Sequence, residues 1–191
     1  HEIQAAQVLL THADLQDHDR HLNARNTLMA LLARGVVPVI NENDAVSFTE
    51  LTVGDNDKLS ALVAALLPAD LLVLLTTAEG LVRNFGKASA KLVPTVKKID
   101  AATRKLAGGT QSSTSVGGMA SKLKAAEIVM RAGIPMLIGN GMQRGVLAKV
   151  LAAEAVGTVF LPGEAKLKGR KRWIAFFHHP QGSMVVDDGA K

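Results

Sequence analysis

Two short polar segments carry most of the carboxylates and amides that could do chemistry. They read Asn41-Glu42-Asn43-Asp44 and Gly54-Asp55-Asn56-Asp57, and the first follows an apolar run. Carboxylates accept hydrogen bonds from an ammonium group, and side-chain amides can bind a carboxylate, so the segments could hold an amino-acid-like substrate. The same residue types cap helices and form turns, and their oxygens also suit a hard metal ion. Two acidic clusters that converge at one strand edge favour a site over capping alone.

A glycine-rich turn before a predicted helix is the second candidate. It reads Val116-Gly117-Gly118-Met119-Ala120-Ser121-Lys122. Adjacent glycines let backbone N–H groups approach an anion, and the start of a helix adds partial positive charge. A cation such as Lys122 in the first turn opposes the helix dipole, which suggests an anionic ligand that offsets the repulsion. The plain alternative is an ordinary glycine-rich loop with a surface lysine, and the P-loop spacing G-x-x-x-x-G-K-[ST] is absent.

A third, weaker candidate is the pair Thr76-Thr77, which follows the apolar run Leu71–Leu75. Hydroxyl groups at the end of a buried strand could contact the base or ribose of a nucleotide. A simple turn would account for the same residues. The histidines match no standard metal-ligand spacing, so we expect His12, His18 and His21 to be solvated surface residues.

The elements that must position these residues alternate along the chain. Short apolar or β-branched runs predict strands, and apolar residues at helical spacing, ended by glycines, predict helices. The predicted strands are Ala6–Leu10, Val36–Ile40, Leu71–Leu75, Pro135–Ile138 and Thr158–Phe160, and the predicted helices are Leu22–Ala33, a helix capped by Asp55, Asp100–Ala107, Met119–Ala132 and Gly145–Ala153. Residues 77–98 should form loops and a hairpin, and Pro38 should make its strand irregular.

This alternation predicts an α/β fold with a mostly parallel sheet and helices on both faces. Ligands bind such sheets outside the carboxyl ends of the strands. That rule selects three segments, 41–57, 76–79 and 110–122, which contain the polar motifs above. The first and third should therefore meet at one sheet edge.

The composition excludes several classes of protein. The sequence of 191 residues is 48% hydrophobic but only 3% aromatic, and it has no cysteine, which rules out disulfides, thiol catalysis and cysteine zinc sites. No apolar stretch is long enough to span a bilayer. The net charge is +5, and cations crowd residues 166–172, as in a linker or an exposed arm. The lack of cysteine fits a reducing cytoplasm.

Five segments, taken in order, resemble one branch of the amino-acid kinase family. They are VPVINENDAV, VGDNDKLSALVA, LVLLTTAEGL, GGMASKLKAA and RKRWI. The NEND and GDND motifs are specific to the branch that phosphorylates glutamate, whereas GGM-x-x-K is shared more widely across the family. The resemblance implies ATP-dependent phosphorylation of the γ-carboxylate of L-glutamate, the first step of proline biosynthesis, in the cytoplasm and with Mg²⁺.

The resemblance also implies roles for the candidate residues. Asp44 and Asn56 would bind glutamate, with Asn41, Asn43 and Asp55 beside them, and Asp57 would organise the catalytic Lys122. The nucleotide would contact the residues Thr76, Thr77, Val116, Gly117, Gly118, Met119, Ala120, Ser121 and Lys122. The family usually has aspartate where Thr77 stands, which weakens that single assignment. No protein ligand for the metal is expected.

The resemblance further implies an αβα-sandwich kinase domain over residues 1–163, a basic linker over 164–172 and the start of an RNA-binding-like PUA domain over 173–191. The family's first strand, with its phosphate-contacting lysine, is missing from the sequence, so we expect the chain to be a fragment that is inactive by itself. A homo-oligomer inhibited by proline is the family expectation. RNA contact through the PUA part is a possible further role.

Three alternatives remain open at this point. A sister kinase of the same fold could act on acetylglutamate, aspartate, carbamate or UMP, although NEND, GDND and RKRWI argue against it. A dinucleotide-binding oxidoreductase would need G-x-G-x-x-G after its first strand, and the sequence lacks that motif. A non-catalytic RNA-binding protein would rest on the basic stretch and Trp173.

Overall fold

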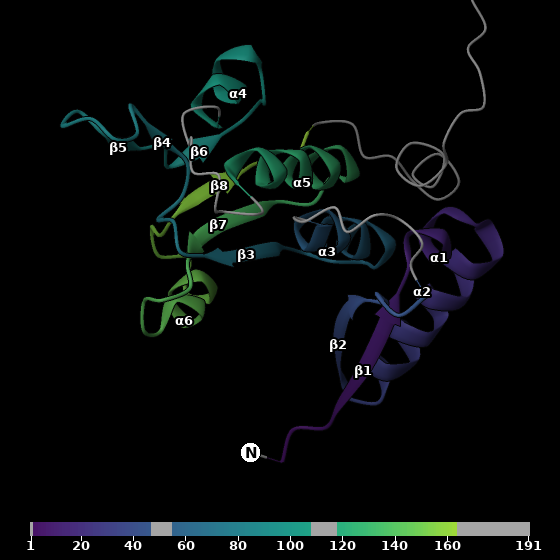
Figure 1. The fold of residues 1–191 in the computed structure, drawn as a ribbon. Helices are drawn as coiled ribbons and strands as arrows, with labels where there is room; N and C mark the ends of the chain where they lie inside the picture. The colour runs from purple at the N-terminus through teal and green to yellow at the C-terminus, as the bar shows by residue number, and fades with distance from the viewer. Residues whose placement is uncertain (1, 47–54, 108–117, 164–191) are drawn as a thin grey trace, which may run out of the picture.

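The chain folds into an α/β structure in which the predicted helices and strands occur in the predicted order, together with one short helix and one short strand that were not predicted (Figure 1). The computed structural model describes residues 2–46, 55–107 and 118–163. The helices are α1 (His12–Gln16), α2 (His18–Ala33), α3 (Asp55–Leu66), α4 (Ala101–Ala107), α5 (Met119–Ala132) and α6 (Val146–Leu151). The strands are β1 (Ala5–Leu10), β2 (Val37–Glu42), β3 (Leu72–Thr76), β4 (Val82–Arg83), β5 (Lys91–Leu92), β6 (Thr95–Val96), β7 (Met136–Asn140) and β8 (Thr158–Phe160).

A four-stranded sheet in the order β3-β7-β8-β6 forms the centre of the larger part of the molecule. β3 runs parallel to β7 and β6 runs parallel to β8, whereas β7 and β8 are antiparallel. Helices α3 and α5 pack against each other on one face, and α6 lies on the other face (Figure 1). The core between them contains fully buried Met136, Ile138, Val129 and Phe160. This arrangement confirms the predicted mostly parallel αβα architecture.

The first part of the chain forms a separate β-α-α-β unit. β1 pairs with β2 in parallel, and α2 crosses between them. Thr11 caps α1 through a reciprocal pair of hydrogen bonds with Asp14. Partial burial raises the pKa of Asp14, but the bonds from Thr11 and the nearby Arg20 outweigh it and leave the pKa below its usual value.

One histidine in this unit contradicts the expectation that all three are solvated. His21 is 8% exposed, and its Nδ1 lies 3.2 Å from the carbonyl oxygen of Leu15, so Nδ1 carries the proton. Burial, opposed by this hydrogen bond, lowers its pKa, with smaller contributions from His18 and Arg25. The residue joins α1 to α2, because its ring in α2 bonds to the backbone of Leu15 in α1.

The predicted element bounds hold best where glycines end the helices. α5 has the predicted bounds, and Gly133 ends it in the left-handed conformation at φ 80°. α2 begins four residues before Leu22 because Asp17 caps it, and Asp55 is the first residue of α3 rather than its cap. Pro38 causes no irregularity and lies in register opposite Ala6. Among the described residues its strand pairs with one other strand only, and such an edge strand tolerates a residue that has no N–H.

A buried threonine ties the β4–β5 hairpin to the sheet. The predicted hairpin is present, and β6 beyond it joins β8 at the sheet edge. Thr158 is fully buried; its hydroxyl donates to the carbonyl of Val93 at 2.7 Å and accepts the N–H of Leu81 at 2.8 Å. Gly80 must be a glycine for this contact, because a Cβ there would lie 2.5 Å from the Thr158 hydroxyl.

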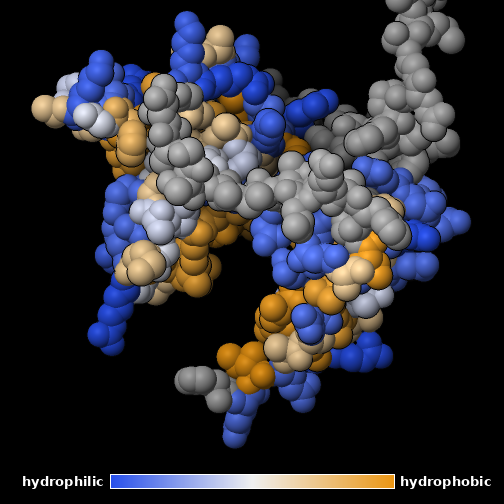
Figure 2. Space-filling model, in the orientation of Figure 1, coloured by the Kyte–Doolittle hydropathy of each residue, from blue (hydrophilic) through white to orange (hydrophobic). Residues whose placement is uncertain are grey.

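The predicted single sheet edge is wrong for the strands that the structure describes, although segments 41–57 and 110–122 do meet, through Asp57 and Lys122. β1 and β2 form their own two-stranded sheet, apart from the four-stranded one. Figure 2 shows an open space between the two parts, with apolar residues on its walls. Val37, Val39 and Leu9 of the small sheet and Leu75 of β3 are all more than two-fifths exposed, at 48%, 57%, 43% and 44%. No helix of the described residues is long and apolar enough to cross a membrane.

Candidate active site

The candidate site centres on Asp57, in the first turn of α3. The helix starts at Asp55 and packs through its apolar stripe, which includes Leu59 and Leu62, against α5 and the sheet. This packing fixes the height and rotation of the first turn. Ser60 strengthens the turn, because its hydroxyl donates to the backbone carbonyl of Asp57 at 2.8 Å. The Asp57 side chain is 17% exposed and points across to α5.

Two adjacent residues in the first turn of α5 bind this carboxylate. The Nζ of Lys122 donates to Oδ2 of Asp57 at 3.0 Å, and the hydroxyl of Ser121 lies 2.5 Å from the same oxygen. The Lys122 side chain is only 12% exposed. α5 keeps these residues in place because it buries Leu123, Ala126 and other apolar residues against the core.

The contact explains how a lysine can occupy the start of a helix. A cation in the first turn of α5 is repelled by the positive end of the helix dipole, and the nearby carboxylate offsets that repulsion. Asp57 itself lies in the first turn of α3, where a negative charge is favourable. In the sequence, Lys122 suggests an anionic ligand, and the structure supplies an internal anion, Asp57, that accounts for part of that signal.

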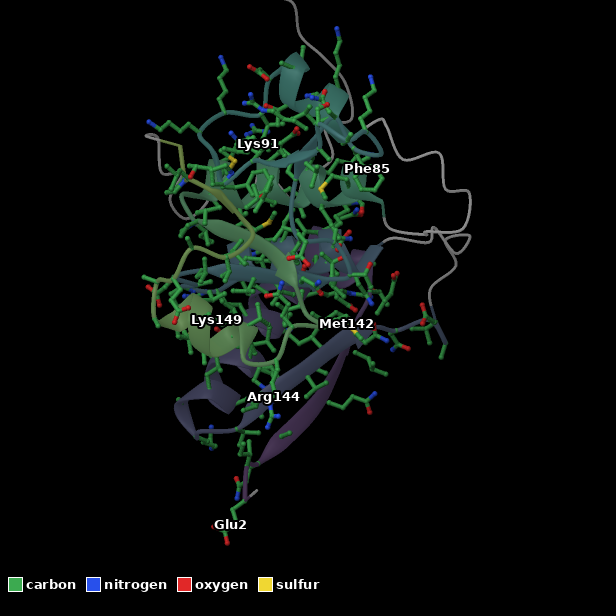
Figure 3. All side chains as sticks on the ribbon, turned by 90° about the vertical axis from the view of Figure 1, so that its left-hand side faces the viewer. Glu2, Phe85, Lys91, Met142, Arg144 and Lys149 are labelled. Atoms are coloured by element: carbon green, nitrogen blue, oxygen red, sulfur yellow. The ribbon has the colours of Figure 1, made fainter. Side chains whose placement is uncertain are left out.

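A second polar cluster lies where β3 and β7 end. Both oxygens of Glu79 accept hydrogen bonds, one from the amide of Asn140 at 2.7 Å and one from the amide of Gln143 at 2.8 Å. The carbonyl of Thr76 accepts from the N–H of Gly141 at 2.8 Å, which holds the two strand ends together. Figure 3 shows Met142 and Arg144 on the same loop between β7 and α6. Glu79 lies in the predicted segment 76–79, but its partners Asn140 and Gln143 were not predicted.

The predicted site residues divide into three groups. The structure brings together Asp57, Ser121 and Lys122. Thr76 lies at the carboxyl end of β3 and Thr77 follows it, exposed. Asn41, Asn43 and Asp44 lie at the carboxyl end of β2, in the other sheet, and among the described residues no hydrogen bond joins them to α3 or α5.

The remaining predicted positions are partly described. Asn56 is exposed in the first turn of α3, next to Asp57, and Asp55 precedes it as a helical residue. Gly118 caps α5, Met119 packs against the core and Ala120 is exposed. Val116 and Gly117, the proposed linker and the proposed PUA part lie outside the described residues.

The described part of the chain contains no group of three or more His, Asp or Glu side chains that could hold a metal ion. Mg²⁺ in such a site would bind mainly through the phosphates of a nucleotide, because it keeps most of its water shell and takes few protein ligands.

The fold and the paired motifs define the class of this protein. Residues 1–140 match the amino acid kinase family, and the chain belongs to that family. The family assignment agrees with the αβα architecture and with the first turns of α3 and α5 meeting through Asp57 and Lys122.

The relatives narrow the comparison to one kind of kinase. The chain is 50% identical to the glutamate 5-kinase of Shewanella amazonensis and 51% identical to that of Moorella thermoacetica, over 98% and 97% of its length. It is 52% identical to the glutamate 5-kinase of Erwinia tasmaniensis. The chain spans about half the length of these relatives, 50%, 50% and 52% respectively.

Solved structures agree on the fold. Carbamate kinase from Giardia lamblia bound to AMP-PNP matches with a TM-score of 0.58 at 18% identity, over 84% of this chain and 62% of that one. UMP kinase from Bacillus anthracis matches with a TM-score of 0.53 at 15% identity, over 87% of this chain and 61% of that one. At these identities the likeness concerns the fold alone.

Proposed function

We propose that the protein carrying this chain transfers the γ-phosphoryl group of ATP to the side-chain carboxylate of L-glutamate. The observation that carries the proposal is the 3.0 Å contact between Lys122 and Asp57, which joins the GDND motif to the GGM-x-x-K motif. Its support is the identity of about half of all positions to several glutamate 5-kinases. The product, glutamyl 5-phosphate, would enter proline biosynthesis.

The chemistry needs no general base. The γ-carboxylate of free glutamate has a pKa of about 4.3 and is ionised at neutral pH, so an oxygen of it can attack the γ-phosphorus directly. The new O–P bond forms while the bond to the β,γ-bridging oxygen breaks and ADP leaves. Asp57 is therefore an orienting group and not a proton acceptor.

The main obstacle is the approach of one anion to another. Phosphoryl transfer is accelerated by positioning and by cations on the non-bridging oxygens, and Lys122 is placed to supply one. The start of α5 at Gly118 adds backbone N–H groups at the same place. Mg²⁺ on the phosphates would neutralise further charge.

Substrate contacts are assigned by position and by the family motif. We assign Asn56 and Asp44 to glutamate, with Asn41, Asn43 and Asp55 around them. Asn56 is exposed beside Asp57, so its amide can reach a ligand in front of α3. We assign the nucleotide to Thr76, Thr77 and the turn at 116–122. We further propose that the whole protein is a cytoplasmic homo-oligomer and that residues 173–191 begin a PUA domain.

The test is a hydroxylamine trap on the full-length protein. Glutamyl phosphate should appear as the hydroxamate only when glutamate and ATP are both present. Asn56→Ala and Asp44→Ala should mainly raise the KM for glutamate. An unchanged glutamate KM in Asn56→Ala would reject the assignment of that residue, and turnover with acetylglutamate, aspartate, carbamate or UMP instead of glutamate would replace the proposed substrate.

A further inference from the structure

Ser121 makes two contacts with a single proton. Its hydroxyl oxygen lies 2.5 Å from Oδ2 of Asp57 and 2.8 Å from the carbonyl oxygen of Gly118. A serine hydroxyl donates only one hydrogen bond, so one of these two acceptors must go without it. The carbonyl of Gly118 already accepts the backbone N–H of Ser121 at 3.0 Å. The carboxylate is the stronger acceptor because it is charged, so the hydroxyl proton goes to Asp57.

Ser60 provides an internal comparison. Its hydroxyl donates to the backbone carbonyl three residues earlier, that of Asp57, at 2.8 Å, which is the same local pattern as Ser121 to Gly118. Both serines lie in or next to the first turn of their helix, and both are partly buried. They differ in one respect, because Ser121 also reaches a carboxylate on the neighbouring helix. The additional contact therefore goes beyond what helix geometry requires of a serine.

The contact fixes a carboxylate that would otherwise be free to turn. An aspartate held by one flexible lysine can rotate about its side-chain bonds, and the lysine stem has four rotatable bonds. With Ser121 on the same oxygen as Lys122, Oδ2 is anchored to the rigid backbone of α5 through a short side chain. The ammonium group is then held relative to α5 itself.

We propose that Ser121 is a positioning residue: its hydroxyl holds Asp57 so that the ammonium of Lys122 keeps its aim toward the transferred phosphoryl group. This role rests on the proposed phosphoryl transfer. It replaces a direct contact between the Ser121 hydroxyl and the nucleotide, since the one proton of that hydroxyl is already used.

Kinetics on the full-length protein give the first test. Ser121→Ala should lower kcat about tenfold, because it removes a hydrogen bond to a charged group. The KM values for ATP and glutamate should each change less than about twofold. Ser121→Thr keeps the hydroxyl and should recover kcat to within about threefold of the original value. Ser60→Ala is the matched control, and it should lower kcat less than about twofold. A raised KM for ATP with unchanged kcat in Ser121→Ala would instead indicate direct nucleotide binding and overturn the proposal.

A second measurement does not depend on activity. Three-bond couplings to Cγ of Asp57, measured by NMR on labelled protein, report its χ1 rotamer. One rotamer is expected in the unsubstituted protein, in Ser121→Thr and in Ser60→Ala, and rotamer averaging is expected in Ser121→Ala. If Asp57 keeps one rotamer in Ser121→Ala, the positioning role is wrong. If no hydroxamate forms in any variant, the proposed function fails, and the rotamer result still decides whether Ser121 holds Asp57.

Discussion

Asp57 and Glu79 are two carboxylates with similar hydrogen bonding and different surroundings. Each accepts from two side chains of a distant segment, Asp57 from Ser121 and Lys122, and Glu79 from Asn140 and Gln143. Asp57 lies in the first turn of a packed helix, its side chain is 17% exposed, and one of its donors is charged. Glu79 is exposed on a loop, and its donors are neutral amides.

This difference in burial and charge separates the Asp57 cluster, a site with a largely buried ion pair, from the Glu79 cluster, which only holds two loops together. Removal of a charged partner from a largely buried carboxylate leaves an uncompensated charge, which costs far more than the pair's net contribution. Water replaces a neutral amide at an exposed carboxylate almost without loss. The hydrogen-bond count alone would rank the two clusters equally, and only burial and charge distinguish them.

The largest expected effect is the loss of the charged donor. Removing one preorganised group from a transition state costs about a hundredfold or more, so Lys122→Ala should lower kcat by at least that factor with little change in the KM for glutamate. Gln143→Ala removes a donor from Glu79 and serves as the control, with an expected change in kcat of less than about twofold. Steady-state kinetics with the hydroxylamine trap measure both. Equal losses in the two variants would abolish the distinction between the clusters.

Stability should show the same contrast at a smaller scale. Asp57→Asn keeps the shape of the side chain but removes the charge beside Lys122, which is 12% exposed, and should lower the free energy of unfolding by about 2 kcal/mol. Urea denaturation at neutral pH measures this. Glu79→Gln is the matched control. A decrease in the free energy of unfolding of less than about 0.5 kcal/mol in Asp57→Asn would mean that solvent already screens the pair.

The buried His21 makes the free energy of unfolding depend on pH, which affects the stability measurements on Asp57→Asn and Glu79→Gln alike. Its pKa in the folded protein lies below the value of 6.5 in an unfolded chain, so the unfolded state binds the proton more readily. Stability is therefore full above pH 6.5 and falls as the pH drops below it toward the lower folded pKa. His21→Gln should flatten this part of the curve in a urea titration across pH, and an unchanged slope would show that another group is responsible.

The smallest effect is expected at Glu79. Glu79→Gln should change the free energy of unfolding by less than about 0.5 kcal/mol, since an exposed carboxylate and an amide both reach solvent. The KM for ATP should change less than about threefold, through a slight displacement of the loop after Thr76. Paired urea and kinetic measurements on this variant and on Asp57→Asn complete the comparison. A loss near 2 kcal/mol at Glu79 would show that the loop contact is structural in its own right.

The sequence predicted the elements where local signals are strong. The bounds of α5 follow from glycines on both sides, and β3 and β8 follow from apolar runs. α1 escaped prediction because its five residues, HADLQ, contain little apolar periodicity and the capping box at Thr11 is its main signal. The short β6 escaped because two residues carry no pattern, and its place is decided by pairing with β8.

The candidate site was predictable to the extent that family motifs mark it. GDND and GGM-x-x-K indicated Asp57 and Lys122, but no local pattern indicates that Lys122 and Ser121 would both donate to one oxygen of Asp57. Segment 76–79 includes Glu79, but its partners Asn140 and Gln143 were missed because they are ordinary polar residues far from it in the sequence. His21 was missed because burial between two helices depends on the angle at which they meet, which spacing does not reveal.

The separation of β1 and β2 from the other described strands has a consequence for how the protein opens. The amide protons of paired strands exchange with solvent together, because the strands of one sheet open as a cooperative unit. Here the ladder is interrupted, so the small β-α-α-β unit should exchange its amide protons independently of the four-stranded sheet and earlier than it. Because α3 contacts β2, local unfolding of the small unit would also disturb the first turn of α3, which contains Asp57.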